Sequence, residues 1–303
     1  MATHQIDLSR DTVHGPFDRH RAPVLTVASG DTVIYETLSA GWERGRGTRG
    51  FERDEGDQGH ALSGPVAVAG AEPGDVLQVD IVALHPADHG WTWAGPWRVP
   101  GLDVHDEVRI DWEIDPDGRI ARAEKYGLLV PIRPFMGVMG NAPAEPGPHD
   151  TGPPRSVGGN LDCRELVPGS CLFLPVAVEG ALFSVGDGHA AQADGEVSGT
   201  AVECAMERVE LRLTVRKDLR FTMPEAITPA GYITIGLGAT LDEAMQQALG
   251  GMLDHLQQST GLDRHVMLAL ASLVVDLRVT QIVNGTVGVH ALLPPDAFQQ
   301  VRL

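Results

Sequence analysis

The sequence predicts a mostly β fold, β-sandwich-like, with a small α/β portion at the C-terminal end that contains two helices. Three observations predict it. The 303 residues include 36 glycines and 21 prolines, well above the roughly 12% of average usage, and these follow no collagen-like period. Short runs of β-branched or alternating apolar residues lie between the turn formers over the first two-thirds of the chain. A helical period is clear only near the end.

The expected strands are bounded by glycine, proline and aspartate. In chain order they cover residues 23–27, 32–37, 76–84, 108–114, 172–178 and 200–215. In the last run Val209, Leu211 and Leu213 alternate with Glu210 and Arg212. Such alternation is typical of an antiparallel strand with one buried face.

The helical part begins at Thr240, which has the spacing of a capping box with Glu243. Apolar residues then recur along one face of a 3.6-residue period: Leu241, Ala244, Met245, Ala248, Leu249, Met252, Leu253 and Leu256. A second helix is expected after Gly261, followed by strands at 277–283 and 287–293. We expect one compact domain over residues 1–303, with a β-rich part (1–220) and a helix-containing part (221–303) packed intimately together.

Charge and cysteine content exclude several classes of function. Lysine and arginine number 23 against 41 aspartates and glutamates, a net charge of −18, so nucleic acid is not an expected partner. No apolar run approaches the ~18 residues needed to span a bilayer, and the first residues lack the pattern of a signal peptide. Cys163, Cys171 and Cys204 make no disulfide framework. We therefore expect a soluble, cytoplasmic protein without a membrane partner.

The segment 186–196 contains the densest group of chemically useful side chains. In an extended chain Asp187 and His189 share a face and can converge on one point. A carboxylate beside an imidazole suits a divalent metal, and Glu196, returning after a turn, is placed to act as a general base on water. The alternative is a polar hairpin in which Asp187 and His189 bond backbone groups. Spacing alone leaves both interpretations open.

Two further candidates lie elsewhere in the chain. Asn160 and Asp162 share a face just after a pair of glycines, and His60 precedes a strand. A lone histidine such as His60 is more often a loop residue with satisfied hydrogen bonds than a ligand. No nucleophile elbow, Walker A motif or dinucleotide fingerprint is present, and neither of the two lysines lies near a serine-rich loop. Hydrolysis at a metal is the chemistry that remains.

At these residues the sequence resembles the acetamidase/formamidase family over roughly residues 20–295. The resemblance is carried by His60 with LSGPV at 62–66, PIRPFMGVMG at 131–140, GGNLD at 158–162, GDGHAAQ at 186–192, DGE at 194–196 and DLRVTQ at 276–281. It implies an acetamidase/formamidase-type, mostly β architecture and hydrolysis of a small linear amide, of the formamide or acetamide type, to its acid and ammonia. It also implies a divalent metal, zinc foremost with calcium as an additional ion, and a homo-oligomer, dimer or larger.

Site roles are assigned on the matched positions. The resemblance implies a metal site at four positions: His60, Asp162, Asp187 and His189. Glu196 is the expected base, with Glu36 as the alternative. Asn160, or the backbone N–H groups of the turn at 158–159, is expected to stabilise the oxyanion.

Two departures from the family pattern bear on the activity. Members commonly carry aspartate where this chain has Ser39, and glycine where it has Ala193. A lost carboxylate at position 39 would change specificity if it contacts substrate or metal. The departures keep a second hypothesis open, a non-catalytic or repurposed β-scaffold that binds a small metabolite or a metal.

Overall fold

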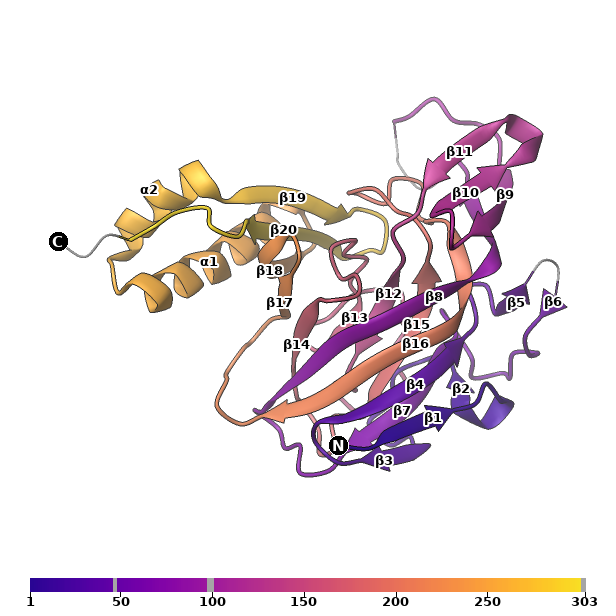
Figure 1. Cartoon of the computed structure of the whole chain (residues 1–303), viewed down its shortest axis with the longest axis horizontal. Helices are drawn as coiled ribbons and strands as arrows, with labels where there is room; N and C mark the ends of the chain where they lie inside the picture. Colours follow the sequence, from indigo (N-terminus) through magenta and orange to yellow (C-terminus); the bar gives the residue numbers. More distant parts are fainter. Residues whose placement is uncertain (46–47, 97–100, 301–303) are drawn as a thin grey trace.

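The computed structural model describes residues 1–45, 48–96 and 101–300 (Figure 1). Its elements are β1 (Thr3–Ile6), η1 (Arg10–Thr12), β2 (Val13–His14), β3 (Leu25–Val27), β4 (Asp31–Thr37), β5 (Glu43–Gly45), β6 (Thr48–Arg49), β7 (Leu62–Val68), β8 (Val76–Ala94), β9 (Val108–Asp115), β10 (Ile120–Ala123), η2 (Glu124–Tyr126), β11 (Leu128–Pro131), β12 (Phe135–Gly140), β13 (Gly158–Asn160), β14 (Cys171–Pro175), β15 (Phe183–His189), β16 (Glu203–Arg216), β17 (Glu225–Thr228), β18 (Gly231–Gly238), α1 (Leu241–Thr260), α2 (Arg264–Val274), β19 (Asp276–Gln281) and β20 (Val287–Leu293).

One ladder of strands runs through the whole molecule. Its order is β1–β4–β16–β8–β14–β17–β18–β20–β19, antiparallel except for the parallel pair β1–β4. The two longest strands, β8 and β16, lie side by side across the middle (Figure 1). Because β14 pairs with β17, the ladder continues from the β-rich part into the residues that carry the helices.

A second ladder, β3–β7–β15–β12–β13, forms the other layer, and β15 is joined to β16 by a short pairing. One apolar core draws side chains from both ladders, among them Tyr35 and Leu211 from the first, and Met139, Phe183 and Val185 from the second. The expected mostly β, sandwich-like architecture is thereby confirmed. The antiparallel strands β9, β10 and β11 extend the sheet from the C-terminal end of β8, where β9 pairs with residues 89–94.

The helices lie where the period predicts them. Ala244, Ala248, Met252 and Leu256 of α1 are buried and form a second core with α2 and β20. The Thr240 hydroxyl oxygen accepts the Glu243 backbone N–H at 3.2 Å, while the Glu243 carboxylate accepts from Ala239, at 2.8 Å, instead of from Thr240. The capping box is thus formed with its second bond shifted by one residue.

The structure contains strands that periodicity did not predict. Strands β7, β12 and β15 are buried on both faces, and β12 and β15 are buried at every position. A strand covered on both sides has no polar face, so its sequence shows no alternation. Strand β8 extends ten residues beyond the expected 76–84, to Ala94, because irregularities in its pairing with β16 carry the ladder past Pro86.

The helices and the cysteines bear on the expectations about membranes and disulfides. Within them, neither α1 nor any other helix combines the length and the apolar character needed to cross a bilayer. All three cysteines are free.

The cap of α1 gives a test of local stability. Thr240→Ala removes the acceptor for the Glu243 N–H, so we expect the free energy of unfolding to fall by about 1 kcal/mol, measured by urea denaturation. Thr240→Ser keeps the acceptor and should restore most of that loss. Equal stability of the alanine variant and the native chain would show that the cap contributes nothing.

Candidate metal centre

Two side chains predicted from segment 186–196, those of Asp187 and His189, meet at the end of β15. The His189 Nε2 atom lies 3.3 Å from the Asp187 Oδ1 atom, so the two side chains converge as their spacing predicts. Asp187 has a φ of 60° although it lies within a strand. A non-glycine residue in this region is strained and is held there by its surroundings, and such residues cluster at functional sites.

Strand β12 presents a glycine to the converging side chains. Met136 pairs with Gly188 and Val138 with Gly186, which sets Gly137 opposite Asp187. A Cβ atom at position 137 would lie 2.4 Å from Asp187 Oδ2 and 2.8 Å from both Asp162 Oδ1 and His189 Cε1. The absence of a side chain on Gly137 therefore makes the space into which the polar groups point.

Asp162 enters this space from the loop after β13. Its backbone N–H bonds the Gly137 carbonyl at 3.3 Å, and its φ is 49°. The Asn284 amide nitrogen donates to Asp162 Oδ2 at 2.7 Å, and the Gln192 amide nitrogen donates to the Asp162 carbonyl at 2.9 Å. Asn284 lies between β19 and β20, so the C-terminal part orients a side chain of the site.

Glu196 also reaches the site, from the turn after β15. Its φ is 45°, and the preceding Gly195 is bound by backbone hydrogen bonds of 3.1 Å to Thr280 and to Ile282. Asp162, His189 and Glu196 each offer one ligand atom, and these atoms lie within 4.8 Å of one another. The structure thus brings together three of the residues predicted from separate motifs.

Glu203, at the start of β16, completes the cluster and was not predicted from the sequence. It pairs in register with His189, and its Oε2 lies 3.3 Å from His189 Nε2. Asp187, His189 and Glu203 form a second set of possible ligands within 4.8 Å. The only sequence signal is an acid in the apolar run between Val202 and Cys204, a place where an unpaired carboxylate would be costly.

The remaining predicted residues differ in position. The His60 Nε2 atom lies 4.0 Å from Asp187 Oδ2, and its Nδ1 contacts the Thr151 hydroxyl at 2.9 Å, so His60 borders the cluster. Asn160 is buried and bonds the Gly152 carbonyl at 3.1 Å through its amide nitrogen. Glu36 points elsewhere: its carboxylate lies 3.3 Å from Arg44, and its side chain is 37% exposed. The structure does not bring Glu36 to the cluster.

Ser39, one of the two departures from the family pattern, forms a hydrogen bond with the backbone. Ser39 is buried, and its hydroxyl oxygen accepts the Glu43 N–H at 3.3 Å within a turn. Ala193, by contrast, lines a cavity that adjoins the cluster.

Burial and mutual repulsion shift the pKa values of the cluster. Burial raises the pKa of Asp162 to about 7, and the Asp187 carboxylate adds to the rise. Burial, followed by the charge of Asp162, holds the pKa of Glu196 well above its usual range. Burial opposes the charged form of His189, yet the Glu203 and Asp187 carboxylates raise the pKa of its imidazole well above the usual value. The protein itself supplies too little positive charge for so many carboxylates.

The donor set fits a divalent cation. Asp162 Oδ1 and Glu196 Oε2 are buried without a hydrogen-bond partner among the described residues, and Asp187 Oδ1 and Glu203 Oε2 have only their 3.3 Å contacts with His189 Nε2. Buried charges are normally paired or bound to metals, and carboxylates with imidazole are the ligands of zinc and its neighbours. The two overlapping sets of ligands share His189.

A cavity of about 600 Å³ adjoins this cluster, and Glu196 and Gln192 line it. Its volume lies within the usual range for small-molecule sites. The cavity gives a route by which a substrate can reach Glu196.

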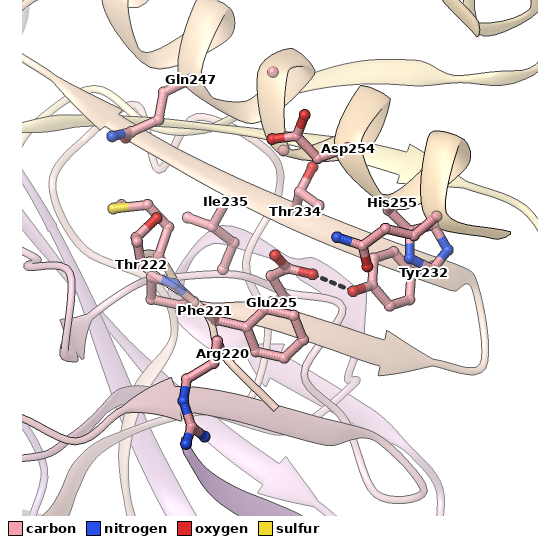
Figure 2. A pocket seen from close by; sticks show the side chains of 15 residues that line it. Arg220, Phe221, Thr222, Glu225, Tyr232, Thr234, Ile235, Gln247, Asp254 and His255 are labelled. Carbon is pink, nitrogen blue, oxygen red and sulfur yellow. Dashed lines mark hydrogen bonds between the residues drawn. The ribbon is translucent and has the colours of Figure 1, made fainter. Parts of the chain in front are cut away.

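A second cavity, of about 440 Å³, lies between the loop before β17, strand β18 and helix α1. Figure 2 shows Glu225 and Tyr232 pointing toward one another, joined by a hydrogen bond, with His255 beside the Tyr232 ring. Burial raises the pKa of Glu225 to about 7. None of the predicted site residues lines this cavity, so we do not place the reaction there.

Comparisons with known proteins agree with the sequence resemblance. The profile of the Acetamidase/Formamidase family matches residues 5–150 and 144–300. An acetamidase of Bacillus halodurans has a crystal structure that matches with a TM-score of 0.84 and 33% identity, covering 95% of this chain and 97% of that one. A predicted acetamidase/formamidase of Thermoanaerobacter tengcongensis matches with a TM-score of 0.86 and 28% identity, covering 97% and 96% of the two chains.

Curated relatives match over shorter stretches. The acetamidase of Mycolicibacterium smegmatis is 30% identical over 200 residues, covering 46% of this chain and 49% of the relative. Across three such relatives, the match spans between 49% and 62% of their lengths.

The close approach at Gly137 gives a test of the cluster. Gly137→Ala places a methyl group among Asp187, Asp162 and His189, so we expect Zn²⁺ affinity, measured by equilibrium dialysis, to fall by at least about tenfold. Gly56→Ala is the control, because a Cβ there meets nothing within 4 Å. Native affinity in the Gly137 variant would contradict a cation site at this point.

Proposed function

The chain belongs to the acetamidase/formamidase family, and from this we propose that it hydrolyses the C–N bond of a small linear amide, of the formamide or acetamide type, to a carboxylate and ammonia with the aid of a divalent metal. One observation carries the proposal: four buried carboxylates, those of Asp162, Asp187, Glu196 and Glu203, surround His189 beside an open cavity. The alternative, a non-catalytic or repurposed β-scaffold that binds a small metabolite or a metal, loses support because the four carboxylates and His189 are all present.

The metal would be held by Asp187, His189 and Glu203, which form one set of donors, and by Asp162, whose set shares His189 with the first; His60 lies at the edge. We propose zinc, with calcium as an additional ion, because imidazole and carboxylate together suit zinc, whereas calcium prefers oxygen ligands. When bound, such an ion supplies Lewis acidity toward the amide carbonyl and lowers the pKa of water toward ~7.

Glu196 is the proposed base. It lines the cavity and lies within reach of the ligand atoms of Asp162 and His189. From there it takes a proton from the attacking water and delivers it to the departing nitrogen, so that ammonia leaves neutral. Asn160, or the backbone N–H groups at 158–159, would stabilise the oxyanion. The Asn160 amide nitrogen is the side-chain donor, and one of its N–H groups bonds the Gly152 carbonyl.

The proposal extends to the domain organisation, the location and the oligomeric state of the protein. We propose a single catalytic domain over 1–303, supported by the pairing of β14 with β17 and by the Asn284 contact to Asp162. A cytoplasmic location is supported by the free cysteines. A homo-oligomer is supported by exposed apolar side chains on α2 and β19, such as Leu268, Leu273 and Leu277.

Removal of the metal tests the reaction directly. Chelation should abolish ammonia release from formamide and acetamide, and added Zn²⁺ should restore it, because the buried carboxylates then regain their counter-charge. Asp187→Ala should lose metal, measured on the same sample, while Asp88→Ala, an exposed site, should keep it. A fully active, metal-free protein would refute the proposal.

A second test concerns proton transfer. Glu196→Gln keeps the shape of the side chain but cannot accept a proton, so kcat for acetamide should fall by about 10²–10⁴ with little change in KM. Glu207→Gln, on the exposed face of β16, serves as the control. If the Glu196 variant kept most of its kcat, another group would have to be the base.

A further inference from the structure

The cavity beside the cluster is larger than a simple amide needs. It has a volume of about 600 Å³, and Glu196 and Gln192 are among the residues that line it. Pockets of this size hold drug-sized ligands, whereas acetamide has only a methyl group beside its carboxamide. The rest of the cavity is therefore free to hold a longer acyl group.

Three arginines from separate segments line this cavity. Arg119 lies in the turn before β10, Arg133 follows β11, and Arg164 follows Asp162 by two residues. Arg119 is an exposed residue in the turn that joins β9 to β10, where its φ is 54°. On a chain with a net charge of −18, three arginines outnumber the two carboxylates, Asp194 and Glu196, that line the same cavity.

The carboxylates nearby neutralise these arginines only in part. Buried Glu165 lies 2.7 Å from Arg133 and 2.9 Å from Arg278, on different oxygens. Arg164 Nε is 3.9 Å from both Glu165 and Asp194 and is buried without a hydrogen bond among the described residues. Within residues 1–45, 48–96 and 101–300, Arg119 forms no ion pair. With Arg278 and Glu165 counted beside the lining residues, four arginines face the three carboxylates of Glu165, Asp194 and Glu196.

Apolar side chains also line the cavity: Trp112, Val130, Ile132, Val197 and Val202. A pocket that combines a reactive carboxylate, apolar walls and guanidinium groups matches an acyl chain that ends in an anion, because guanidinium binds carboxylates in a bidentate manner.

We propose that the substrate of this protein is a linear carboxamide whose acyl chain carries a negatively charged group, and that Arg119, Arg133 and Arg164 select it. The proposal rests on the proposed amide hydrolysis and names its substrate class. Arg133 is oriented by Glu165, whereas Arg119 is free to close on the anion.

The test compares succinamate with butyramide, which differ by a carboxylate in place of a terminal methyl group. We expect kcat/KM to be at least about tenfold higher for succinamate at low salt, the effect of about 1.4 kcal/mol, and the preference to shrink as salt rises. Arg119→Gln should remove about tenfold of the succinamate value and leave butyramide within about twofold, while Arg119→Lys should recover part of the loss.

Arg122→Gln is the matched control, because Arg122 is an exposed arginine three residues further along, on β10, and lies outside the cavity lining. Equal rates for the two amides, unchanged by Arg119→Gln, would overturn the proposal and leave amide hydrolysis intact. If neither amide is hydrolysed, the proposed function fails instead, and calorimetric titration with succinamate decides: binding weakened by Arg119→Gln supports the anion site, and no binding overturns it.

Discussion

The burial of four carboxylates around one imidazole is the constraint on which the site depends. Asp162, Asp187, Glu196 and Glu203 are each less than a tenth exposed, and water cannot screen their repulsion. A cation is the simplest counter-charge, and His189 is the one member of the cluster that becomes positively charged when it is protonated; its pKa is raised by the Glu203 and Asp187 carboxylates. The surrounding structure can be understood as what holds these groups together.

The arrangement strains the backbone at three of these residues. Asp162, Asp187 and Glu196 all adopt positive φ values, which only a well-packed environment maintains. The packing comes from the register of β12, β15 and β16, which sets Gly137 and Glu203 beside His189. Fold and site are therefore linked: a shift of one residue in either pairing would turn the ligands away from one another.

Much of this arrangement was predictable. Alternation located β4 and β16, the capping box located the start of α1, and spacing in segment 186–196 predicted the meeting of Asp187 and His189. Strands β7, β12 and β15 were missed because they are buried on both faces and show no period. Glu203 and Gly137 act only through cross-strand register, which a single sequence does not encode locally, and Glu36 shows that a plausible acid can lie on a different face.

The contact between Asn284 and Asp162 has a consequence for synthesis of the protein. Residues that lie more than 100 positions apart in the chain must meet before the Asp162 carboxylate is oriented, and Gly195 is anchored by the same C-terminal segment. A nascent chain that has not yet released residue 284 from the ribosome holds most of the β-layers but lacks this brace. The Asp162 carboxylate is therefore oriented late in synthesis, only after residue 284 has left the ribosome and can pack against the β-layers.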